Sequence, residues 1–535
     1  MHTKRILLAA VIGCLVLPAS LAQTAIQYTT TGDRSRSFAV SQVQGEATTV
    51  EEGSIRRNVD ETYQTMEGFG FAMTYSACYN LLQMSPESRR ELLTRTFSPT
   101  QGYGASYIRI SIGCSDFSST EYSLCDIKGP DHDLLRHFRL YKDETDYVIP
   151  VLKEILAINP DLKIMGSPWT CPRWMKVDSP TSLQPHDAWT DGHLSPAYYR
   201  TYADYFVRFI QAFQSEGIPI YSVTPQNEPL NPGNCASLVM NWNEEAAFVK
   251  QLAGAIQRAG LTTKIYVFDH NYNYDGISSQ QQYPVKIYDL LADRNFAGKE
   301  LIAGAAYHNY GGSTDELIRI HQSYPDKELI FTEASIGTWN HGRDLDTSLA
   351  DIAQNVALQT VNKWCTGVIV WNFMLDMNRG PNLDGGCQTC FGAVDVAGDY
   401  QSYTLNSHYY ALCHLSAVVR PGAVRIAGGG WNMQGVTYAT FRNPDGTLAV
   451  VLYNSLSTPL SLHVTDNSVR YPLAVPPRSM VSLLMDNSAT YVPARHADIH
   501  ANEGSGTPAP QSMPTKVHNR KGKKFRSVGA KREQL

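Results

Sequence analysis

The sequence predicts an α/β protein: a (β/α)8 TIM barrel with an appended antiparallel β-sandwich. Between about residues 65 and 372, short strand-like runs alternate with amphipathic helices, as in parallel α/β folds. Eight such units over roughly 300 residues fit a closed barrel better than an open sheet. After about Pro421 the pattern changes to short strands separated by turns, which is typical of a sandwich.

The barrel elements follow from apolar runs and from helix-start signals. Helices are expected at 146–158, 196–216, 243–259 and 348–364, and another begins at Ser85 with Pro86 in its first position. The eight expected strands are residues 65–71, 107–112, 162–166, 218–224, 264–268, 302–306, 328–332 and 366–371.

The sandwich strands are expected at 435–442, 447–454, 459–465 and 478–485, with a turn at Asn443 to Gly446. Candidate strands at 48–50 and 54–58 would join the same sandwich. The predicted division is therefore a signal peptide (1–22), N-terminal strands of the sandwich (23–64), the catalytic barrel (65–415), the C-terminal sandwich (416–490) and a disordered basic tail (491–535).

The N-terminus has the features of an export signal. Lys4 and Arg5 precede an apolar stretch at 6–17, and small residues then predict cleavage after Ala22. This stretch is too short to span a membrane. Cys14 offers an alternative lipoprotein cleavage site, but the residues after it stay apolar. We therefore expect a soluble protein that is secreted or periplasmic.

Composition narrows the range of partners. The chain has 535 residues, 43% of them hydrophobic, and a net charge of −5, which gives no reason to expect nucleic acid as a partner. No later segment is apolar enough for a membrane span, and a monomer is expected. The basic tail is either a solvated extension or a segment attracted to an anionic cell surface.

Cysteine spacing favours a disulfide over a metal site. Cleavage would leave nine cysteines, of which Cys387 and Cys390 are the only close pair. A zinc site would need a second pair or a histidine couple at suitable spacing, and the sequence has neither. A loop-stapling disulfide is the preferred interpretation, buried free thiols are the alternative, and no metal or cofactor is expected.

Two glutamates at strand ends carry the predicted chemistry. Glu228 follows the fourth strand and Glu333 follows the seventh, so both would lie at the mouth of the barrel. A charge at the end of a buried strand is costly, but two such carboxylates suit a glycosidase. Glu228 would act as the acid/base, with a raised pKa, and Glu333 as the ionised nucleophile, about 5–5.5 Å apart as in a retaining enzyme.

Neighbouring residues could complete the site, and each has a structural alternative. Asn227 could donate a hydrogen bond to a sugar hydroxyl, and His308 and Tyr310 could orient Glu333 or bind sugar. Arg109 could hold the nucleophile and Asp116 could bind hydroxyls, unless the two form a structural ion pair. In addition, Trp169 and Trp371 could stack on sugar rings or belong to the rim of the core.

These motifs together resemble glycoside hydrolase family 30, the glucosylceramidase-like group of (β/α)8 enzymes. The resemblance implies that Glu228 is the acid/base and that Glu333 is the nucleophile. It also implies a glucose subsite lined by Asp116, Trp169, Asn227, His308, Tyr310 and Trp371. The matching segments are 68–74 (GFGFAMT), 109–118 (which ends in DFS), 167–176 (SPWTCPRWMK), 224–229 (TPQNEP), 307–310 (YHNY), 331–334 (FTEA) and 371–372 (WN).

The resemblance leaves the substrate open among glucosylceramide, β-1,6-glucan and xylan. The insertion at 378–390 departs from the mammalian lipid-cleaving pattern and looks more like the loops of bacterial β-1,6-glucanases, so an endo-β-1,6-glucanase is expected. Two rival classes are a metal-dependent barrel hydrolase and a carbohydrate-binding protein. The first strand has no histidine pair for a metal, and a binder gains nothing from two repelling carboxylates.

Overall fold

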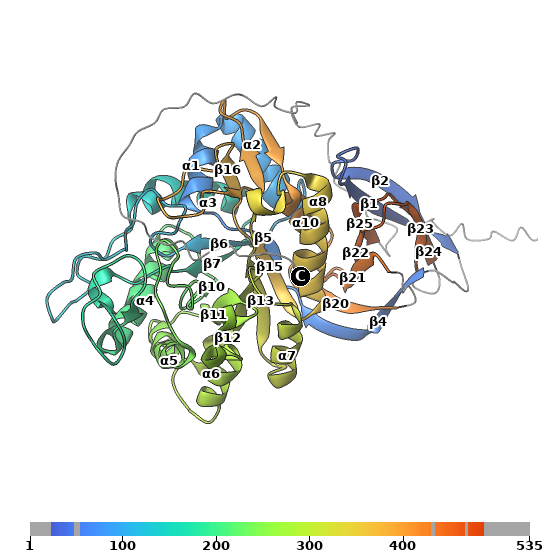
Figure 1. Ribbon diagram of the computed structural model, residues 1–535. Helices are drawn as coiled ribbons and strands as arrows, with labels where there is room; N and C mark the ends of the chain where they lie inside the picture. The colour runs from blue at the N-terminus through green and yellow to red at the C-terminus, as the bar shows by residue number, and fades with distance from the viewer. Residues whose placement is uncertain (1–22, 48–53, 430–433, 466–468, 486–535) are drawn as a thin grey trace, which may run out of the picture.

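The computed structural model describes residues 23–47, 54–429, 434–465 and 469–485 (Figure 1). The expected signal peptide with Ala22 and Cys14, the candidate strand 48–50 and the basic tail 491–535 lie outside the described residues. Within the described residues, no helix is both long and apolar enough to cross a membrane.

Eight parallel strands form the barrel, in the spatial order β5-β15-β13-β12-β11-β10-β7-β6. Hydrogen bonds from Met73 N to Arg109 O (2.8 Å) and from Ser106 N to Phe69 O (2.9 Å) join the first and last strands of this order. Gly70 lies at this seam, where a Cβ atom would stand 2.1 Å from the carbonyl oxygen of Tyr107, so only glycine permits the approach. The strands are β5 (Gly68–Phe71), β6 (Tyr107–Ser111), β7 (Lys163–Ser167), β10 (Ser222–Val223), β11 (Lys264–Asn271), β12 (Ile302–His308), β13 (Glu328–Glu333) and β15 (Cys365–Val370).

The predicted barrel is confirmed, with differences at strand ends. The fourth strand shrinks from 218–224 to two residues because Pro219 and Pro225 lie on either side of β10 and cannot donate to a ladder. Thr65 belongs to the sandwich strand β4 (Ser54–Thr65) and not to the barrel. The fifth strand, β11, continues three residues beyond the predicted end at residue 268, which brings polar side chains into the barrel mouth.

Helices cover the outside of the barrel (Figure 1). Ser85 caps α2 by accepting a hydrogen bond from Ser88 N, with Pro86 in the first turn as predicted. The expected helix at 348–364 is interrupted by a π-helical segment, 352–358, and the one at 146–158 is preceded by another, 144–148. The helices are α1 (Tyr75–Gln83), α2 (Pro86–Phe97), α3 (Ile149–Ile158), α4 (Tyr199–Ser215), α5 (Trp242–Arg258), α6 (Tyr283–Ala292), α7 (Asp315–Ser323), α8 (Leu345–Asp351), α9 (Gln359–Asn362) and α10 (Ser407–Ser416).

The sandwich is built from both ends of the described chain. Its sheet has the order β2-β1-β25-β22-β21-β20-β4-β23-β24-β3, in which β1 pairs with β25 and β4 pairs with β20. The sequence missed β24, which contains Pro472 and therefore does not look like a strand. The remaining strands are β1 (Thr24–Thr31), β2 (Ala39–Gln44), β3 (Glu46–Ala47), β20 (Val424–Gly429), β21 (Val436–Arg442), β22 (Leu448–Asn454), β23 (Leu460–Thr465), β24 (Val469–Val475) and β25 (Ser479–Met485).

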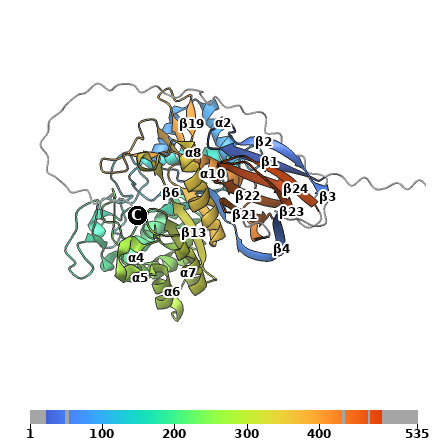
Figure 2. The ribbon, with the colours of Figure 1, turned by 45° about the vertical axis from the view of Figure 1, so that its right-hand side comes forward.

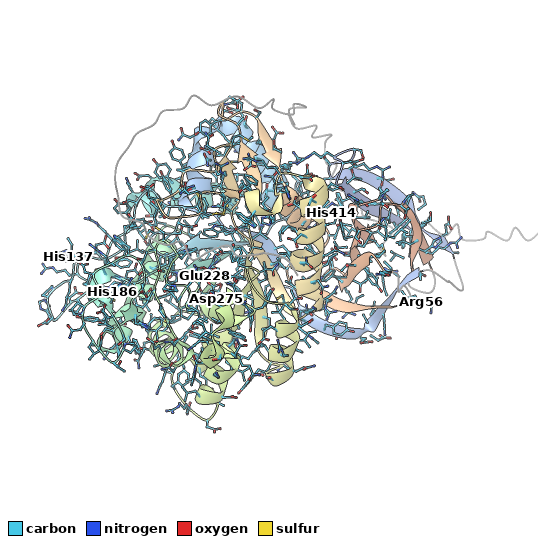
Figure 3. All side chains as sticks on the ribbon, viewed as in Figure 1. Arg56, His137, His186, Glu228, Asp275 and His414 are labelled. Atoms are coloured by element: carbon cyan, nitrogen blue, oxygen red, sulfur yellow. A yellow bond between two sulfur atoms is a disulfide. The ribbon has the colours of Figure 1, made fainter. Side chains whose placement is uncertain are left out.

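Helix α10 lies between the barrel and the sandwich, as the two views of the ribbon show (Figures 1 and 2). His414 on this helix is buried and faces the sandwich (Figure 3). Its Nδ1 donates to Ser482 Oγ (2.8 Å), because that hydroxyl already donates to the His414 carbonyl oxygen. Its Nε2 accepts from Thr30 Oγ1 (2.8 Å), which holds the imidazole neutral, and burial lowers the pKa of His414 to about 3.

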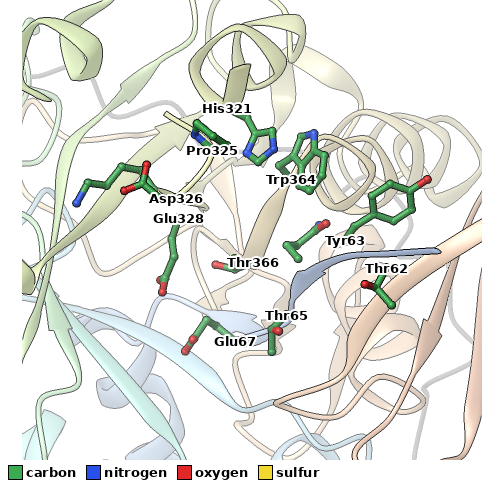
Figure 4. A pocket seen from close by; sticks show the side chains of 12 residues that line it. Thr62, Tyr63, Thr65, Glu67, His321, Pro325, Asp326, Glu328, Trp364 and Thr366 are labelled. Atoms are coloured by element: carbon green, nitrogen blue, oxygen red, sulfur yellow. The ribbon is translucent and has the colours of Figure 1, made fainter. Parts of the chain in front are cut away.

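A pocket at the amino-terminal end of the barrel is lined by Glu67, Glu328, His321 and Trp364, among others (Figure 4). His321 stacks on Trp364 with ring centroids 3.7 Å apart. Lys264 Nζ lies 3.2 Å from Glu67 and 2.9 Å from Glu328. Since Glu328 begins β13 and Glu333 ends it, this pocket lies at the end of the barrel opposite to the two glutamates.

Candidate active site

The carboxyl ends of the barrel strands bring the predicted residues together. Glu333 is the last residue of β13, His308 is the last residue of β12, and Glu228 lies in the loop after β10. Arg109 comes from β6 on the other side of the barrel mouth. All four side chains are buried or nearly so. The strand ends therefore concentrate charge where the barrel opens.

Arg109 is fully buried and binds several of these groups at once. Its Nη1 donates to Glu333 Oε2 (2.5 Å), and its Nη2 donates to Asn227 Oδ1 and Asp269 Oδ2 (2.7 Å each). The ion-pair partners of Arg109 are thus Asp269 and Glu333, and the expected alternative of a pair with Asp116 is wrong. The guanidinium also lies 5.0 Å from the ring centroid of Trp169.

Asp269 is the centre of the network and was missed by the sequence analysis. Burial alone would raise its pKa, but the charges of Arg109 and His308 and the surrounding hydrogen bonds hold this pKa well below its usual range. It is therefore a permanent negative charge. Its carboxylate accepts from Arg109 Nη2 (2.7 Å), Ser167 Oγ (2.8 Å), Thr224 Oγ1 (2.7 Å), His308 Nε2 (2.9 Å) and Thr332 Oγ1 (2.7 Å).

His308 lies between the two glutamates. Its Nδ1 is 3.2 Å from Glu228 Oε1, and its Nε2 is 4.0 Å from Glu333 Oε2. Burial alone would lower the pKa of His308, but Glu333 and Asp269 raise it to about 9. The imidazole is therefore charged at neutral pH. Because both carboxylates approach one ring, they face a common space.

Glu228 has a left-handed backbone conformation and several hydrogen-bond partners. Its φ of 46° is in the left-handed region, which costs roughly 1–3 kcal/mol for a residue with a side chain. The conformation is held by a hydrogen bond from its own N–H to Asp269 O (3.0 Å). Its Oε2 accepts from Asn231 Nδ2 (2.7 Å). Burial favours a higher pKa for Glu228, but His308, His270 and Asn231 together lower it.

Glu333 is held by Arg109 and by Tyr310, whose hydroxyl donates to Oε1 (3.0 Å). Burial raises the pKa of Glu333, and the charges of Glu228 and Asp269 add to the rise against the opposing effect of His308 and Arg109. The sequence led us to expect the reverse, a raised pKa at Glu228 and an ionised Glu333. The directions differ because burial outweighs the effect of His308 and Arg109 at Glu333, whereas His308, His270 and Asn231 together outweigh burial at Glu228.

The buried N–H groups of this region that lack partners among the described residues include Asn227 Nδ2 and Trp169 Nε1. Leaving such donors unsatisfied is costly, so they suit a polar ligand. The rings of Trp169 and Trp371 are only 1% and 3% exposed and lie 5.1 Å apart, beside Arg109. In the free protein neither ring is therefore exposed as an open stacking platform.

Asp116 lies beneath the loop that carries the disulfide. Burial, together with the charge of Glu333, raises the pKa of Asp116 well above its usual range. The Leu383 N–H donates to the Asp116 carbonyl oxygen (2.9 Å). The expected disulfide between Cys387 and Cys390 is confirmed. The seven other cysteines among the described residues are buried thiols.

Three carboxylates, Glu228, Glu333 and Asp269, face two cations, Arg109 and His308, in a water-poor site. Such a site can exchange a proton with a bound group through one carboxylate and attack an electron-poor carbon with the other. One group in it could also hold a metal ion: Glu228, His270 and His308 offer ligand atoms within 4.8 Å of one another.

A (β/α)8 barrel with two carboxylates converging at the ends of its fourth and seventh strands defines the class of barrel glycoside hydrolases. Comparison with known proteins narrows the class. The chain matches the glycosyl hydrolase family 30 TIM-barrel domain at residues 66–419 and the family 30 β-sandwich domain at 422–483. The chain belongs to glycosyl hydrolase family 30.

Relatives in this family carry two kinds of name. The endo-1,6-β-D-glucanase BGN16.3 of Trichoderma harzianum is 30% identical, over 76% of this chain and 80% of its own. Putative glucosylceramidase 4 of Caenorhabditis elegans is 29% identical, over 86% and 88%. A solved structure, the endo-β1,6-glucanase BT3312, is 54% identical with a TM-score of 0.81, and the match covers 86% of this chain and 99% of that one.

Proposed function

We propose that this glycoside hydrolase is an endo-β-1,6-glucanase that works by double displacement with retention of configuration. The 54% identity to the endo-β1,6-glucanase BT3312, over 86% of this chain, carries the proposal for the substrate. The approach of Glu228 and Glu333 to a single imidazole supports the proposal for the mechanism. Retaining enzymes place their carboxyl groups about 5–5.5 Å apart, and that separation stays a prediction here.

In the first step, Glu333 attacks the anomeric carbon while Glu228 gives its proton to the departing glycosidic oxygen. The C–O bond breaks, and a sugar–Glu333 ester forms. Arg109 and Tyr310, which bind the Glu333 oxygens, keep the carboxylate aimed as its charge is lost. In the second step, Glu228 takes a proton from water, the oxygen of which displaces Glu333 from the sugar.

In the free protein, the pKa directions of Glu228 and Glu333 are opposite to those that the acid and nucleophile roles require. In the free site the pKa of Glu228 is lowered and that of Glu333 is raised, whereas the reaction needs the proton on Glu228. Sugar entering the site removes water around Glu228 and favours its protonated form.

The proposed substrate contacts use the unpaired N–H groups. Asn227 Nδ2 and Trp169 Nε1 would donate to sugar hydroxyls beside the reacting carbon, which strengthens binding as charge develops there. His308, Tyr310, Asp116 and Trp371 complete the proposed sugar subsite, with Arg109 as support. No cofactor takes part in this proposal.

We also propose that the protein is exported, with cleavage after Ala22, and that it works as a monomer. The organisation we propose is a signal peptide at 1–22, strands at 23–64 that join the sandwich, a barrel at 65–415, the C-terminal sandwich at 416–490 and a basic tail at 491–535. The two family matches, which meet near residue 420, support a boundary there. Lipid attachment at Cys14 and attraction of the tail to a cell surface are alternatives for experiment.

A product profile on β-1,6-glucan, run beside glucosylceramide, tests the substrate. We expect short β-1,6-linked oligosaccharides from the polymer and little ceramide from the lipid. Release of ceramide at a higher kcat/KM than glucan cleavage would reject the glucanase proposal in favour of the glucosylceramidase alternative.

The acid role of Glu228 is tested through the leaving group. Glu228→Gln should lose about 10²–10⁴-fold in kcat/KM on glucan, because general acid catalysis contributes roughly that much. Formation of the glycosyl-enzyme from an aryl glucoside with a strongly acidic phenol should change far less, since that phenol departs without a proton. If Glu228→Gln slowed formation of the glycosyl-enzyme equally for glucan and for the aryl glucoside, Glu228 would not be the general acid.

A further inference from the structure

His270 is a fully buried histidine beside the acid/base residue to which the reaction assigns no task. Its Nε2 lies 3.0 Å from Asp275 Oδ2, so this nitrogen donates its proton to the carboxylate. Its Nδ1 has no partner among the described residues. Figure 3 labels Glu228 and Asp275, both on the barrel half of the molecule.

His308 repeats this arrangement. Its Nε2 lies 2.9 Å from Asp269 Oδ1, and its Nδ1 points to Glu228 Oε1 at 3.2 Å. Each histidine is thus anchored through Nε2 by a carboxylate, which leaves Nδ1 as the nitrogen that is free to bind a metal ion. In metal sites, histidine ligands are characteristically oriented by a carboxylate on the ring nitrogen that does not bind the metal.

We propose that Glu228, His270 and His308 form a binding site for a transition-metal ion of the Zn²⁺ type, which inhibits the enzyme by occupying its acid/base residue. One ligand atom from each residue lies within 4.8 Å of the other two. The ion would take the place of the proton between His308 Nδ1 and Glu228 Oε1. Site occupancy is independent of the proposed function, whereas the inhibition rests on it.

The geometry and ligand types match zinc better than harder cations. Tetrahedral Zn²⁺ with bonds of about 2.0–2.1 Å needs ligand atoms roughly 3.3 Å apart, close to the His308–Glu228 separation of 3.2 Å. His270 would complete the set by a small movement of its ring. Two imidazoles and one carboxylate suit Zn²⁺ and Cu²⁺, while Mg²⁺ and Ca²⁺ prefer oxygen ligands. A fourth position would stay open toward the sugar subsite.

Calorimetric titration of the chelator-treated enzyme with ZnCl₂ tests occupancy without reference to activity. We expect one site in the wild type that His270→Ala weakens by about 100-fold or more, because loss of a ligand costs at least as much as loss of an orienting carboxylate. Asp275→Asn keeps the shape of the side chain and should weaken the site about 10- to 100-fold. MgCl₂ should give no heat from this site.

His193→Ala is the matched control, because His193 also pairs with a carboxylate, Glu244 at 2.9 Å, but belongs to no such group of ligands among the described residues. It should leave the Zn²⁺ isotherm unchanged. Circular dichroism and Tm establish whether each variant folds. If His270→Ala fails to fold, the Zn²⁺ isotherm of Asp275→Asn tests the metal site. Unchanged isotherms in both site variants would overturn the proposal.

Turnover of an aryl glucoside in the presence of ZnCl₂ then tests the inhibition, which should be competitive and weaker in Asp275→Asn. Zn²⁺ that binds in a His270-dependent manner without slowing turnover would support the metal site but reject Glu228 as the acid/base. Inhibition that persists in all three variants would arise elsewhere on the protein and would count against this site.

Discussion

The two ends of the barrel both hold charged clusters, yet the clusters are built differently. At the amino-terminal end, Lys163 and Lys264 face Glu67 and Glu328, and these side chains are 15–30% exposed. At the carboxyl end, Arg109, His308 and Asp269 are completely buried beside the two glutamates. The first cluster is balanced and partly solvated, while the second is buried and carries an excess of carboxylates.

This difference indicates a structural role for the first cluster and a functional role for the second. In the amino-terminal cluster, two cations balance the charge of two anions. The site at the carboxyl end has three carboxylates and two cations, so a further positive charge is favourable there; burial and the charges of Glu228 and Asp269 raise the pKa of Glu333. An oxocarbenium-like transition state supplies such a charge. The unfavourable electrostatics of the free site are thus relieved during the proposed reaction.

The largest effect should come from Glu333. Glu333→Ala should lower kcat on an aryl β-glucoside by about 10⁴-fold or more, as for other residues that act within a catalytic unit. Glu328→Ala, at the other end of the same strand, should change kcat less than about 10-fold. Initial rates at saturating substrate measure both. Unchanged turnover in Glu333→Ala would show that the catalytic assignment is wrong.

Asp269→Asn should have the next largest effect, which we expect in the free energy of unfolding, because the change leaves Arg109 and His308 without their common anion. Breaking a buried ion pair costs about 3–5 kcal/mol in the free energy of unfolding. Glu67→Gln, in the partly exposed cluster, should cost about 1 kcal/mol. Urea denaturation at pH 7 compares them. Equal losses would mean that the two clusters differ less in desolvation than their burial indicates.

His308→Gln should shift the pH dependence of kcat/KM. The charged imidazole lowers the pKa of both Glu228 and Glu333, so its removal should raise both values and move both limbs of the profile to higher pH. The shift should be about one pH unit or more. Rates on an aryl glucoside from pH 3 to 8 measure it, and a profile that moves to lower pH would contradict the assignment of charge to His308.

Stability should depend on pH in opposite ways at two histidines. His414 stays neutral when folded, with a pKa of about 3, but titrates near 6.5 when unfolded. Its contribution is therefore lost as pH falls below about 6.5, by about 1.4 kcal/mol per pH unit. His308, with a pKa of about 9, contributes stability below 6.5 that is lost as pH rises through 9.

The His414→Gln variant should flatten the acid side of the stability curve, and His308→Gln the alkaline side. Urea titrations at pH 5, 6, 7, 8 and 9 measure both slopes. His408, also buried with a pKa lowered to about 3, keeps part of the acid slope in either variant. An unchanged acid slope in His414→Gln would show that the histidine between α10 and the sandwich is not neutral when folded.

The sequence alone located most of the site, because strand ends are visible in it. Apolar runs that stop at Glu228, His308 and Glu333 marked three strand ends, and closure of the barrel brought these ends together. Asp269 was missed although it gives the same signal. The apolar run 264–268 stops immediately before it, as the other runs stop at their polar strand ends.

Partners and protonation were decided only by the tertiary structure. Glu333 and Asp269 lie 224 and 160 residues from Arg109 in sequence, so no local pattern indicates that Arg109 binds them and leaves Asp116 alone. The pKa directions of Glu228 and Glu333 depend on which carboxylate His308 touches, a matter of about an ångström. Composition and periodicity determine which residues reach the barrel mouth, because burial and backbone pairing follow local sequence. Electrostatics between those residues depends on distance and desolvation, which exist only once the chain is folded.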